Sequence, residues 1–287
     1  MLSPWGAAAL SAAGLVWLAL LMAGTEPALC RMGLLRRNFQ GRPIPVGIGL
    51  VVLLWALPAL GVLAVLAPAG IRATTAFAAV ILAFGLLGLA DDLWGDRRAT
   101  GLRGHVGELL RHGRVTTGLL KLVGGALAAT LVPRLILDRT WPAALLEGAL
   151  IALSANLLNL LDLRPGRCAA VFLVLGSLAS LADAFARGGV RLPPLLLVLV
   201  PALAVYPRDA RGQAMLGDVG SNLLGAALGL ALALAIRAPA GELALVAVLG
   251  AVHVAAERWS LTALIERAPA LRALDRLTGI RGDSASE

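Results

Sequence analysis

The sequence predicts an all-α integral membrane protein that crosses the bilayer about nine times. Hydrophobic residues make up 59% of the 287 residues and charged residues 15%, and the mean hydropathy is +0.86. Soluble globular domains of this length are much less apolar. Apolar runs also recur along the chain, each near the roughly 20 residues that a helix needs to cross a hydrocarbon core.

Nine apolar runs define the predicted spans. They cover roughly residues 5–23, 46–67, 74–90, 117–137, 143–161, 168–186, 192–206, 219–236 and 242–256. The seventh run is short and begins near Pro193 and Pro194, so it is the weakest of the set. No soluble domain or long linker separates the runs. We therefore predict one transmembrane domain over residues 1–260 and a tail over residues 261–287.

The positions of the basic residues predict the orientation. The connections after the first, third, fifth, seventh and ninth runs contain 19 of the 25 lysines and arginines. Basic residues collect in cytoplasmic loops, so the N-terminus is expected outside and the C-terminal tail inside. The tail mixes leucine, alanine and isoleucine with charges at helical spacing, which predicts an interfacial amphipathic helix on the cytoplasmic side.

The net charge of +8 has two interpretations. Membrane topology alone accounts for most of it. However, the excess charge also lies beside acidic motifs on the same side of the membrane, which suits polyanionic substrates and anionic lipid headgroups. We expect no nucleic-acid partner, because the charge is spread over short loops without interleaved aromatic residues.

The stretch "ALSANLLNLLDLRPGR", residues 152–167, carries polar residues inside an apolar run. Asn156, Asn159 and Asp162 are spaced i, i+3, i+6, which places them within about 120° on one face of a helix. Arg164 and Arg167 follow in the turn. One interpretation is a polar seam that neighbouring helices satisfy. Because a charge inside lipid is costly, a functional site is the preferred interpretation.

Two further acidic motifs are predicted at cytoplasmic helix ends. "FGLLGLADDLWGDRR" ends the third run with Asp91 and Asp92, followed by Asp96. "AMLGDVGSNLLGAALG" opens the eighth run with Asp218 between glycines. Asp218 could simply cap that helix, but small residues at a helix N-terminus also admit a phosphate or its metal ion. Carboxylates converging from three helices predict an oxygen-rich site suited to Mg²⁺.

These three motifs, in this order and topology, resemble those of the polyprenyl-phosphate N-acetylhexosamine-1-phosphate transferases. That superfamily includes the phospho-MurNAc-pentapeptide translocase and the undecaprenyl-phosphate GlcNAc-1-phosphate transferases. The resemblance extends from about residue 36 to about residue 260. The stretches "GRPIPVGIGL", residues 41–50, and "TTGLLKLVGG", residues 116–125 with Lys121, are similar to further family motifs.

The resemblance implies a Mg²⁺-dependent enzyme of the cytoplasmic membrane, with Mn²⁺ as an alternative ion, that acts in cell-envelope glycan synthesis. A sugar 1-phosphate would pass from a UDP-sugar to a polyprenyl phosphate, with release of UMP. The resemblance implies that Asp218 binds the metal ion and that Asp91 and Asp92 assist the reaction of the lipid phosphate. It implies that Asn156, Asn159 and Asp162 bind the nucleotide sugar. The positive charges that balance the phosphates would come from Lys121, Arg164 and Arg167. Asp96 and Arg42, beside these motifs, are further candidates.

The chain departs from the family pattern at two places. Asp162 is followed by "LRPGR", whereas the family usually places glycine there, so the implied donor recognition differs. Many members carry a His-rich cluster in the last cytoplasmic loop, but this chain has three histidines in all. His253 and Glu257 are i, i+4 neighbours on a predicted helix and form a candidate substitute for that cluster. The alternative is that His253 is structural.

Three function classes remain open from the sequence. The leading one is the phosphoglycosyl transferase, with the identity of the sugar open. The second is a non-catalytic homologue that binds polyprenyl phosphate or nucleotide sugar and recruits partners through its tail. The third is a transporter, since intramembrane acids also mark ion pathways. The residues leave the oligomeric state open, and the resemblance suggests a homodimer.

Overall fold

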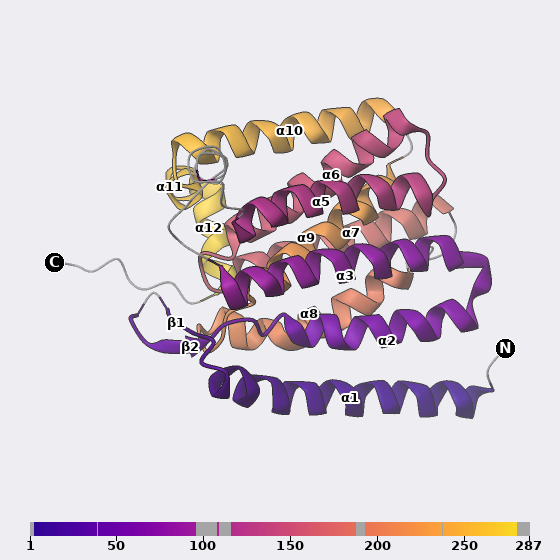
Figure 1. The fold of residues 1–287 in the computed structure, drawn as a ribbon, viewed down its shortest axis with the longest axis horizontal. Coiled ribbons are helices and arrows are strands. Elements are labelled where there is room, and N and C mark those ends of the chain that lie inside the picture. The colour runs from indigo at the N-terminus through magenta and orange to yellow at the C-terminus, as the bar shows by residue number, and fades with distance from the viewer. Residues whose placement is uncertain are drawn as a thin grey trace.

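The computed structural model describes residues 3–38, 40–95, 108, 116–187, 193–236 and 238–279. Within these ranges, nine helices of 17 to 28 residues run back and forth in a bundle (Figure 1). They are α1 (Pro4–Arg31), α2 (Leu50–Leu66), α3 (Ile71–Trp94), α5 (Thr117–Leu135), α6 (Trp141–Leu161), α7 (Arg167–Arg187), α8 (Pro193–Ala210), α9 (Gly217–Ala235) and α10 (Pro239–Arg258). A 3₁₀ turn, η1 (Pro68–Gly70), links α2 to α3.

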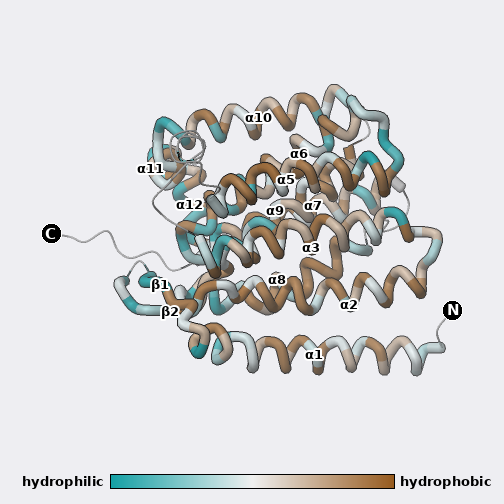
Figure 2. The backbone as a smooth tube through the Cα atoms, viewed as in Figure 1, coloured by the Kyte–Doolittle hydropathy of each residue, from teal (hydrophilic) through white to brown (hydrophobic). Residues whose placement is uncertain are grey.

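The chain is an all-α polytopic membrane protein. Seven helical segments of the described part are long and apolar enough to cross a membrane: Pro4–Arg31, Pro68–Trp94, Thr117–Leu135, Trp141–Leu161, Arg167–Ala186, Gly217–Ala235 and Pro239–Arg258. The α2 helix is apolar but shorter, at 17 residues. Apolar residues occupy the middle of the bundle and hydrophilic residues its ends (Figure 2). Nine spans, and the orientation of the N-terminus, stay predictions.

The central helix of the bundle is α9, and glycines bring its neighbours close. Its side chains are buried along almost the whole length. A Cβ atom on Gly225 would lie 2.5 Å from Ala155 Cα, and one on Gly229 would lie 2.6 Å from Ile151 Cα, both on α6. Small residues of this kind let transmembrane helices pack backbone against backbone. The close packing fixes the position of α9 against α6.

A short β-hairpin precedes α2, and the sequence did not predict it. The strands β1 (Leu35–Arg37) and β2 (Pro43–Pro45) pair antiparallel, with Arg36 opposite Ile44. The second span was expected to begin at residue 46, but α2 begins at Leu50. The reason is that the backbone N–H groups of Gly47 and Ile48 both donate to the Met215 carbonyl, just before α9. This pairing places the hairpin beside the start of α9.

The C-terminal tail folds back over the same end of the bundle. It forms α11 (Leu261–Arg267) and α12 (Pro269–Thr278), whereas one interfacial helix was expected. Proline has no backbone N–H group to donate inside a helix, but it is tolerated in the first turn. Pro269 accordingly ends the first short helix and begins the second. Figure 1 shows both short helices at the end where β1 and β2 also lie.

Candidate functional site

The acidic motifs meet because the helices that carry them end or begin at the same end of the bundle. The α3, α6 and α8 helices end there, and α5, α7 and α9 begin there (Figure 1). The chain reverses direction at each crossing, so the end of one helix and the start of the next lie on the same side, and motifs far apart in sequence become neighbours. The sequence predicted this convergence from the distribution of basic residues.

Lys121 lies between two carboxylates that come from different helices. Its Nζ atom donates to Asp91 at 3.0 Å and also donates to Asp218. The Thr117 hydroxyl, one turn earlier on α5, donates to the other oxygen of Asp91 at 2.6 Å. The side chains of Asp91, Lys121 and Asp218 are each about one-fifth exposed. We call these four residues the Lys121 cluster.

Asp92 has a different environment from Asp91, although the two are adjacent in sequence. Its side chain is fully buried, and Oδ2 accepts from the Val219 N–H at 2.9 Å. Its Oδ1 lies 3.6 Å from the Arg36 guanidinium of the hairpin. Asp92 thus caps the N-terminus of α9 from a neighbouring helix. Asp218 does not cap α9, because it lies within the first turn and its carboxylate faces Lys121.

Two glycines make this close approach of α3 to α9 sterically feasible. A Cβ atom on Gly88 of α3 would lie 2.1 Å from the Asp218 carbonyl oxygen. Gly217 has a φ of +72°, in the left-handed region that glycine adopts readily, and a Cβ there would lie 2.6 Å from Asp92 Oδ2. Larger residues at either position would push apart the helix ends that form the site.

Of the three polar residues expected on one face of α6, Asn159 binds a side chain of α9. Its side-chain oxygen accepts from the Ser221 hydroxyl at 2.8 Å, and within α9 the Asn222 amide donates to the Asp218 carbonyl at 2.6 Å. Asn156, one turn earlier, is exposed. The Asn159 contact fits the polar-seam interpretation, while Asp162 lies at the end of α6 and faces a pocket.

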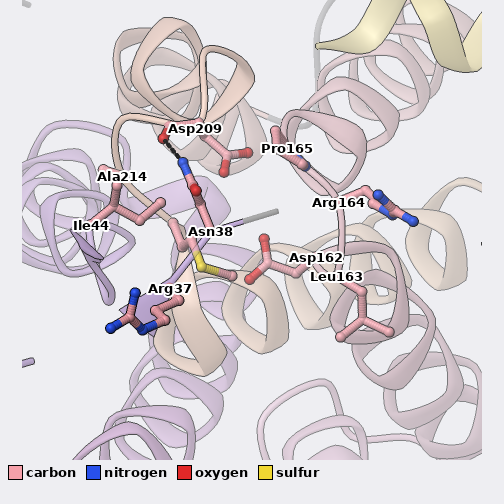
Figure 3. A pocket seen from close by; sticks show the side chains of 11 residues that line it. Arg37, Asn38, Ile44, Asp162, Leu163, Arg164, Pro165, Asp209 and Ala214 are labelled. Carbon is pink, nitrogen blue, oxygen red and sulfur yellow. Dashed lines mark hydrogen bonds between the residues drawn. The ribbon is translucent and has the colours of Figure 1, made fainter. Parts of the chain in front are cut away.

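The pocket beside the start of α9 has a volume of about 440 Å³. It is lined by Arg37, Asn38, Ile44, Asp162, Leu163, Arg164, Pro165, Asp209, Gly212, Ala214 and Met215. In Figure 3 the Asp162 carboxylate points into the space between Asn38, Asp209 and Pro165. Burial raises the pKa of Asp162 well above its usual range, and the nearby carboxylates of Asp209, Asp218 and Asp92 raise it further.

Asp209 and Asn38 shape the pocket wall, and sequence reasoning did not select either. Asp209, at the end of α8, is buried, and Oδ2 accepts from the Gly166 N–H at 3.1 Å. The Asn38 amide donates to the Gly212 carbonyl at 3.1 Å (Figure 3). A signal for Asp209 was present, because it stands beside Arg208 and Arg211 in a predicted cytoplasmic loop, as the selected acids do.

Thr117 was also not selected from the sequence. Thr116 and Thr117 precede Lys121 at the predicted start of a span, and a hydroxyl one turn before a lysine lies on the same helical face. The Thr116 hydroxyl accepts from the Leu119 N–H and caps α5. Thr117 is then free of the capping role and orients Asp91.

Arg167 turns toward the tail. Its guanidinium forms two hydrogen bonds to Asp275 of α12, at 2.5 and 2.8 Å, and one to Thr262 of α11 at 2.9 Å. Its side chain is 4% exposed. Arg164 lies at the pocket rim, and its side chain points away from Asp162 in Figure 3. The structure therefore assigns Arg167 a tail-binding contact that the sequence did not anticipate.

The remaining candidates lie at the periphery or outside the described residues. Arg42 is exposed on the hairpin, where its backbone N–H donates to Asn38 Oδ1 at 3.0 Å. His253 Nδ1 contacts the Leu249 carbonyl one turn earlier at 2.7 Å, as a structural histidine would. Glu257 is exposed on α10. Asp96 lies outside the residues that the structure describes.

The donor set around Lys121 is two carboxylates and a hydroxyl. Within the described ranges, no group of three or more His, Cys, Asp or Glu side chains is arranged to hold a metal ion. Mg²⁺, however, is typically bound by one or two protein carboxylates together with substrate phosphates and water. Asp91 and Asp218 already hold one cation, the Lys121 ammonium, between them.

No protein-family model matches this chain, and no curated protein matches it.

Proposed function

We propose that the protein transfers a sugar 1-phosphate from a UDP-sugar to a membrane polyprenyl phosphate, with release of UMP. The observation that carries the proposal is the Lys121 cluster, in which Asp91 of α3 and Asp218 of α9 share the ammonium of α5. This cluster lies at the end of the bundle where a pocket with cationic and acidic residues opens. The family resemblance of the three acidic motifs supplies the reaction.

Two phosphate groups must approach each other in this reaction, so the site must neutralise negative charge. Lys121 supplies one positive charge at the junction of three helices, and Arg37 and Arg164 supply two at the pocket rim. Preorganised charges of this kind stabilise developing charge without reorganisation. A bound Mg²⁺, held by Asp218 and Asp91, would add neutralisation of the pyrophosphate, and Mn²⁺ is the alternative ion.

The different environments of Asp91 and Asp92 suggest different roles. Asp91 is about one-fifth exposed and is bound by two side-chain donors, the Lys121 ammonium and the Thr117 hydroxyl. Asp92 is fully buried and bound to the backbone of α9. A group that takes a proton from a lipid phosphate must reach it, which favours Asp91 for that role. Asp92 is then a positioning residue that holds the first turn of α9, and with it Asp218.

The pocket suits the UDP-sugar for an electrostatic reason. The pKa of Asp162 is raised, so this carboxyl group is easier to protonate, and a neutral carboxyl group does not repel a pyrophosphate. A protonated Asp162 can also donate a hydrogen bond to a sugar or uracil oxygen. The volume of about 440 Å³ falls within the roughly 300–1,000 Å³ that small-molecule pockets occupy.

The test is Mg²⁺-dependent UMP release by the purified protein, given undecaprenyl phosphate and a panel of UDP-sugars. We expect release with one donor, a fall of at least 100-fold in Asp218→Asn, and little change in Glu266→Gln, whose carboxylate is exposed on α11. Equal release by wild type and Asp218→Asn would rule out the assigned site. Release that persists without the lipid would indicate hydrolysis of the UDP-sugar.

A second candidate function is favoured by the tail. Arg167, implied to balance phosphate charge, is bound by Asp275, and α12 packs on the turn after Asp162. A homologue without catalytic activity, which binds the lipid phosphate or nucleotide sugar and presents its tail to partners, would also show this arrangement. If the protein binds undecaprenyl phosphate but releases no UMP with any UDP-sugar of the panel, this candidate is favoured.

A further inference from the structure

The C-terminal helix α12 carries an apolar face that the bundle leaves exposed. Leu271, Leu274 and Leu277 recur every three residues, so they lie along one face of the helix. They are 50%, 60% and 78% exposed. Single exposed leucines are ordinary on a protein surface, but a continuous stripe of them on one short helix indicates a contact with something apolar. We call these three residues the leucine stripe.

The exposed charges of α12 have one sign. Arg272 and Arg276 are exposed and lie one turn apart, so they share a second face. Asp275 is the one acidic residue of α12, and its carboxylate accepts two hydrogen bonds from the Arg167 guanidinium, at 2.5 and 2.8 Å. The two exposed charges are therefore both positive. Leucine on one face and arginine on the other is the pattern of helices that lie in a membrane interface.

The place of α12 in the fold fits such an interface. Figure 1 shows α12 running across the ends of the long helices, at the end of the bundle where β1 and β2 also lie. It contacts the start of α7 through Arg167 and the last turns of α8 through Tyr206. Both of these helices expose apolar side chains farther along, such as Leu178 of α7 and Leu203 of α8, which a bilayer would cover. The α12 helix thus lies where this apolar surface ends.

We propose that α12 binds the surface of an anionic bilayer, with the leucine stripe among the acyl chains and with Arg272 and Arg276 at the lipid phosphates. The apolar face would attach to any bilayer, and the arginines make the attachment depend on lipid charge. A protein partner would have to present an apolar groove and acidic side chains together at the membrane surface. An anionic bilayer presents both chemistries all around this end of the bundle, so we commit to the bilayer.

The same helix braces the pocket, so its attachment to lipid affects the proposed site. The end of α12 packs on the turn that follows Asp162, where a Cβ atom on Gly166 would overlap the Thr278 carbonyl oxygen. That carbonyl also accepts from the Tyr206 hydroxyl at 3.0 Å. The Gly166 N–H in turn donates to Asp209, which lines the pocket. Lipid that holds α12 in place would thereby hold the pocket wall, and this consequence rests on the proposed function, in which the pocket takes the UDP-sugar.

The test measures amide hydrogen exchange of the purified full chain in nanodiscs, by mass spectrometry. One set of nanodiscs contains phosphatidylcholine alone, and the other contains equal parts of phosphatidylcholine and phosphatidylglycerol. Each arginine near an anionic surface strengthens attachment roughly fivefold, so exchange in α12 should be about tenfold slower in the anionic nanodiscs. Exchange in the turn of residues 162–167 should slow together with it, because α12 packs on this turn.

Two pairs of matched variants separate the two faces of α12. The double variant Arg272→Gln, Arg276→Gln should abolish the difference between the two bilayers, whereas Arg272→Lys, Arg276→Lys should retain it. The double variant Leu274→Gln, Leu277→Gln should speed exchange of α12 in both bilayers, whereas Leu274→Met, Leu277→Met should not. All four side chains are exposed, so these variants should fold as wild type does.

Equal exchange of wild-type α12 in the two bilayers would overturn the proposal and leave the leucine stripe for a protein partner. A fluorophore on Leu274→Cys gives an independent readout, in a Cys30→Ser background, because the other cysteine, Cys168, is buried. Spin-labelled lipid should quench this fluorophore, and aqueous iodide should not. Quenching by iodide alone would contradict the proposal.

These measurements require no catalysis, so this proposal and the proposed function fail separately. Exchange of α12 that depends on lipid charge, in a protein that releases no UMP with any donor, would sustain the membrane contact and contradict the transferase. UMP release by a protein whose α12 exchanges equally in both bilayers would sustain the transferase and contradict the membrane contact.

Discussion

The carboxylates of Asp91 on α3 and Asp218 on α9 bind the same ammonium group, that of Lys121 on α5. Two negative charges and one positive charge are thus gathered at the junction of three helices. The cluster retains a net negative charge, which a further cation would neutralise. This relationship ties the stability of the bundle end to the chemistry that we assign to it.

Replacement of Lys121 by Met should destabilise the protein. The two carboxylates would lose their shared cation in a site that is about one-fifth exposed, and loss of one partner of such a pair costs about 2–4 kcal/mol. The melting temperature in detergent measures the effect, and Lys121→Arg serves as the charge-preserving control. We further expect millimolar Mg²⁺ to raise the melting temperature more in Lys121→Met than in wild type. An unchanged melting temperature without Mg²⁺ would show that the cluster contributes no stability.

Gly88→Ala should separate α3 from the start of α9. The added Cβ would lie 2.1 Å from the Asp218 carbonyl oxygen, so the helices must shift, at a cost of about 1–3 kcal/mol. UMP release should fall together with the melting temperature. Gly61→Ala on α2 is the matched control, because a Cβ there meets nothing within 4 Å and alanine favours a helix. Activity that survives in Gly88→Ala would mean that the helix ends need not approach so closely.

The helices could be predicted from the sequence because their signal is local. Apolar runs near 20 residues identify the nine long helices of the described residues without reference to their neighbours, and basic loops indicate which ends lie together. The hairpin could not be predicted in this way. Its strands have three residues each, too few for a pattern, and they are fixed by pairing with residues near Met215 far along the chain.

The residues of the site could be predicted from the sequence, but the contacts that each residue makes could not. Asp91, Lys121 and Asp218 were selected together, and the structure brings them into contact. Arg167 was selected by its position beside Asp162, yet its guanidinium binds Asp275, because a nearly buried arginine requires an anion and the tail supplies one. Such choices depend on tertiary contacts that residue spacing does not encode.

Asp275→Asn should release α12 from the bundle. Without the carboxylate, the Arg167 guanidinium would stay nearly buried without an anion, so undocking of the tail is favoured over global unfolding. Trypsin should then cleave after Arg272 and Arg276 several-fold faster than in wild type. The exposed carboxylate of Glu266 on α11 provides the matched control, Glu266→Gln. Equal cleavage of Asp275→Asn and wild type would show that the ion pair does not hold the tail.

The stability of the protein should depend on the protonation of Asp162. Its pKa is raised in the folded state above the ordinary value of 3.8, so the folded protein binds this proton more tightly than the unfolded chain. Folding stability therefore falls as pH rises from about 4 to the raised pKa. The Asp162→Asn variant has no titratable group at this position and does not lose this stability. The melting temperature of the variant minus that of wild type should therefore increase as pH rises from 4 to 8. A difference that is constant or shrinks over this range would contradict the raised pKa.

The most direct test of the central claim follows the phosphate itself. UDP-sugar labelled with ³²P at the β-phosphate is incubated with the purified protein, Mg²⁺ and undecaprenyl phosphate, and the lipid is extracted with butanol. We predict that the label enters the lipid with UMP as the co-product, and that Asp218→Asn abolishes the transfer. Label that stays in the aqueous phase, from wild-type protein given every donor of the panel, would contradict the claim that this site transfers a sugar phosphate to a lipid.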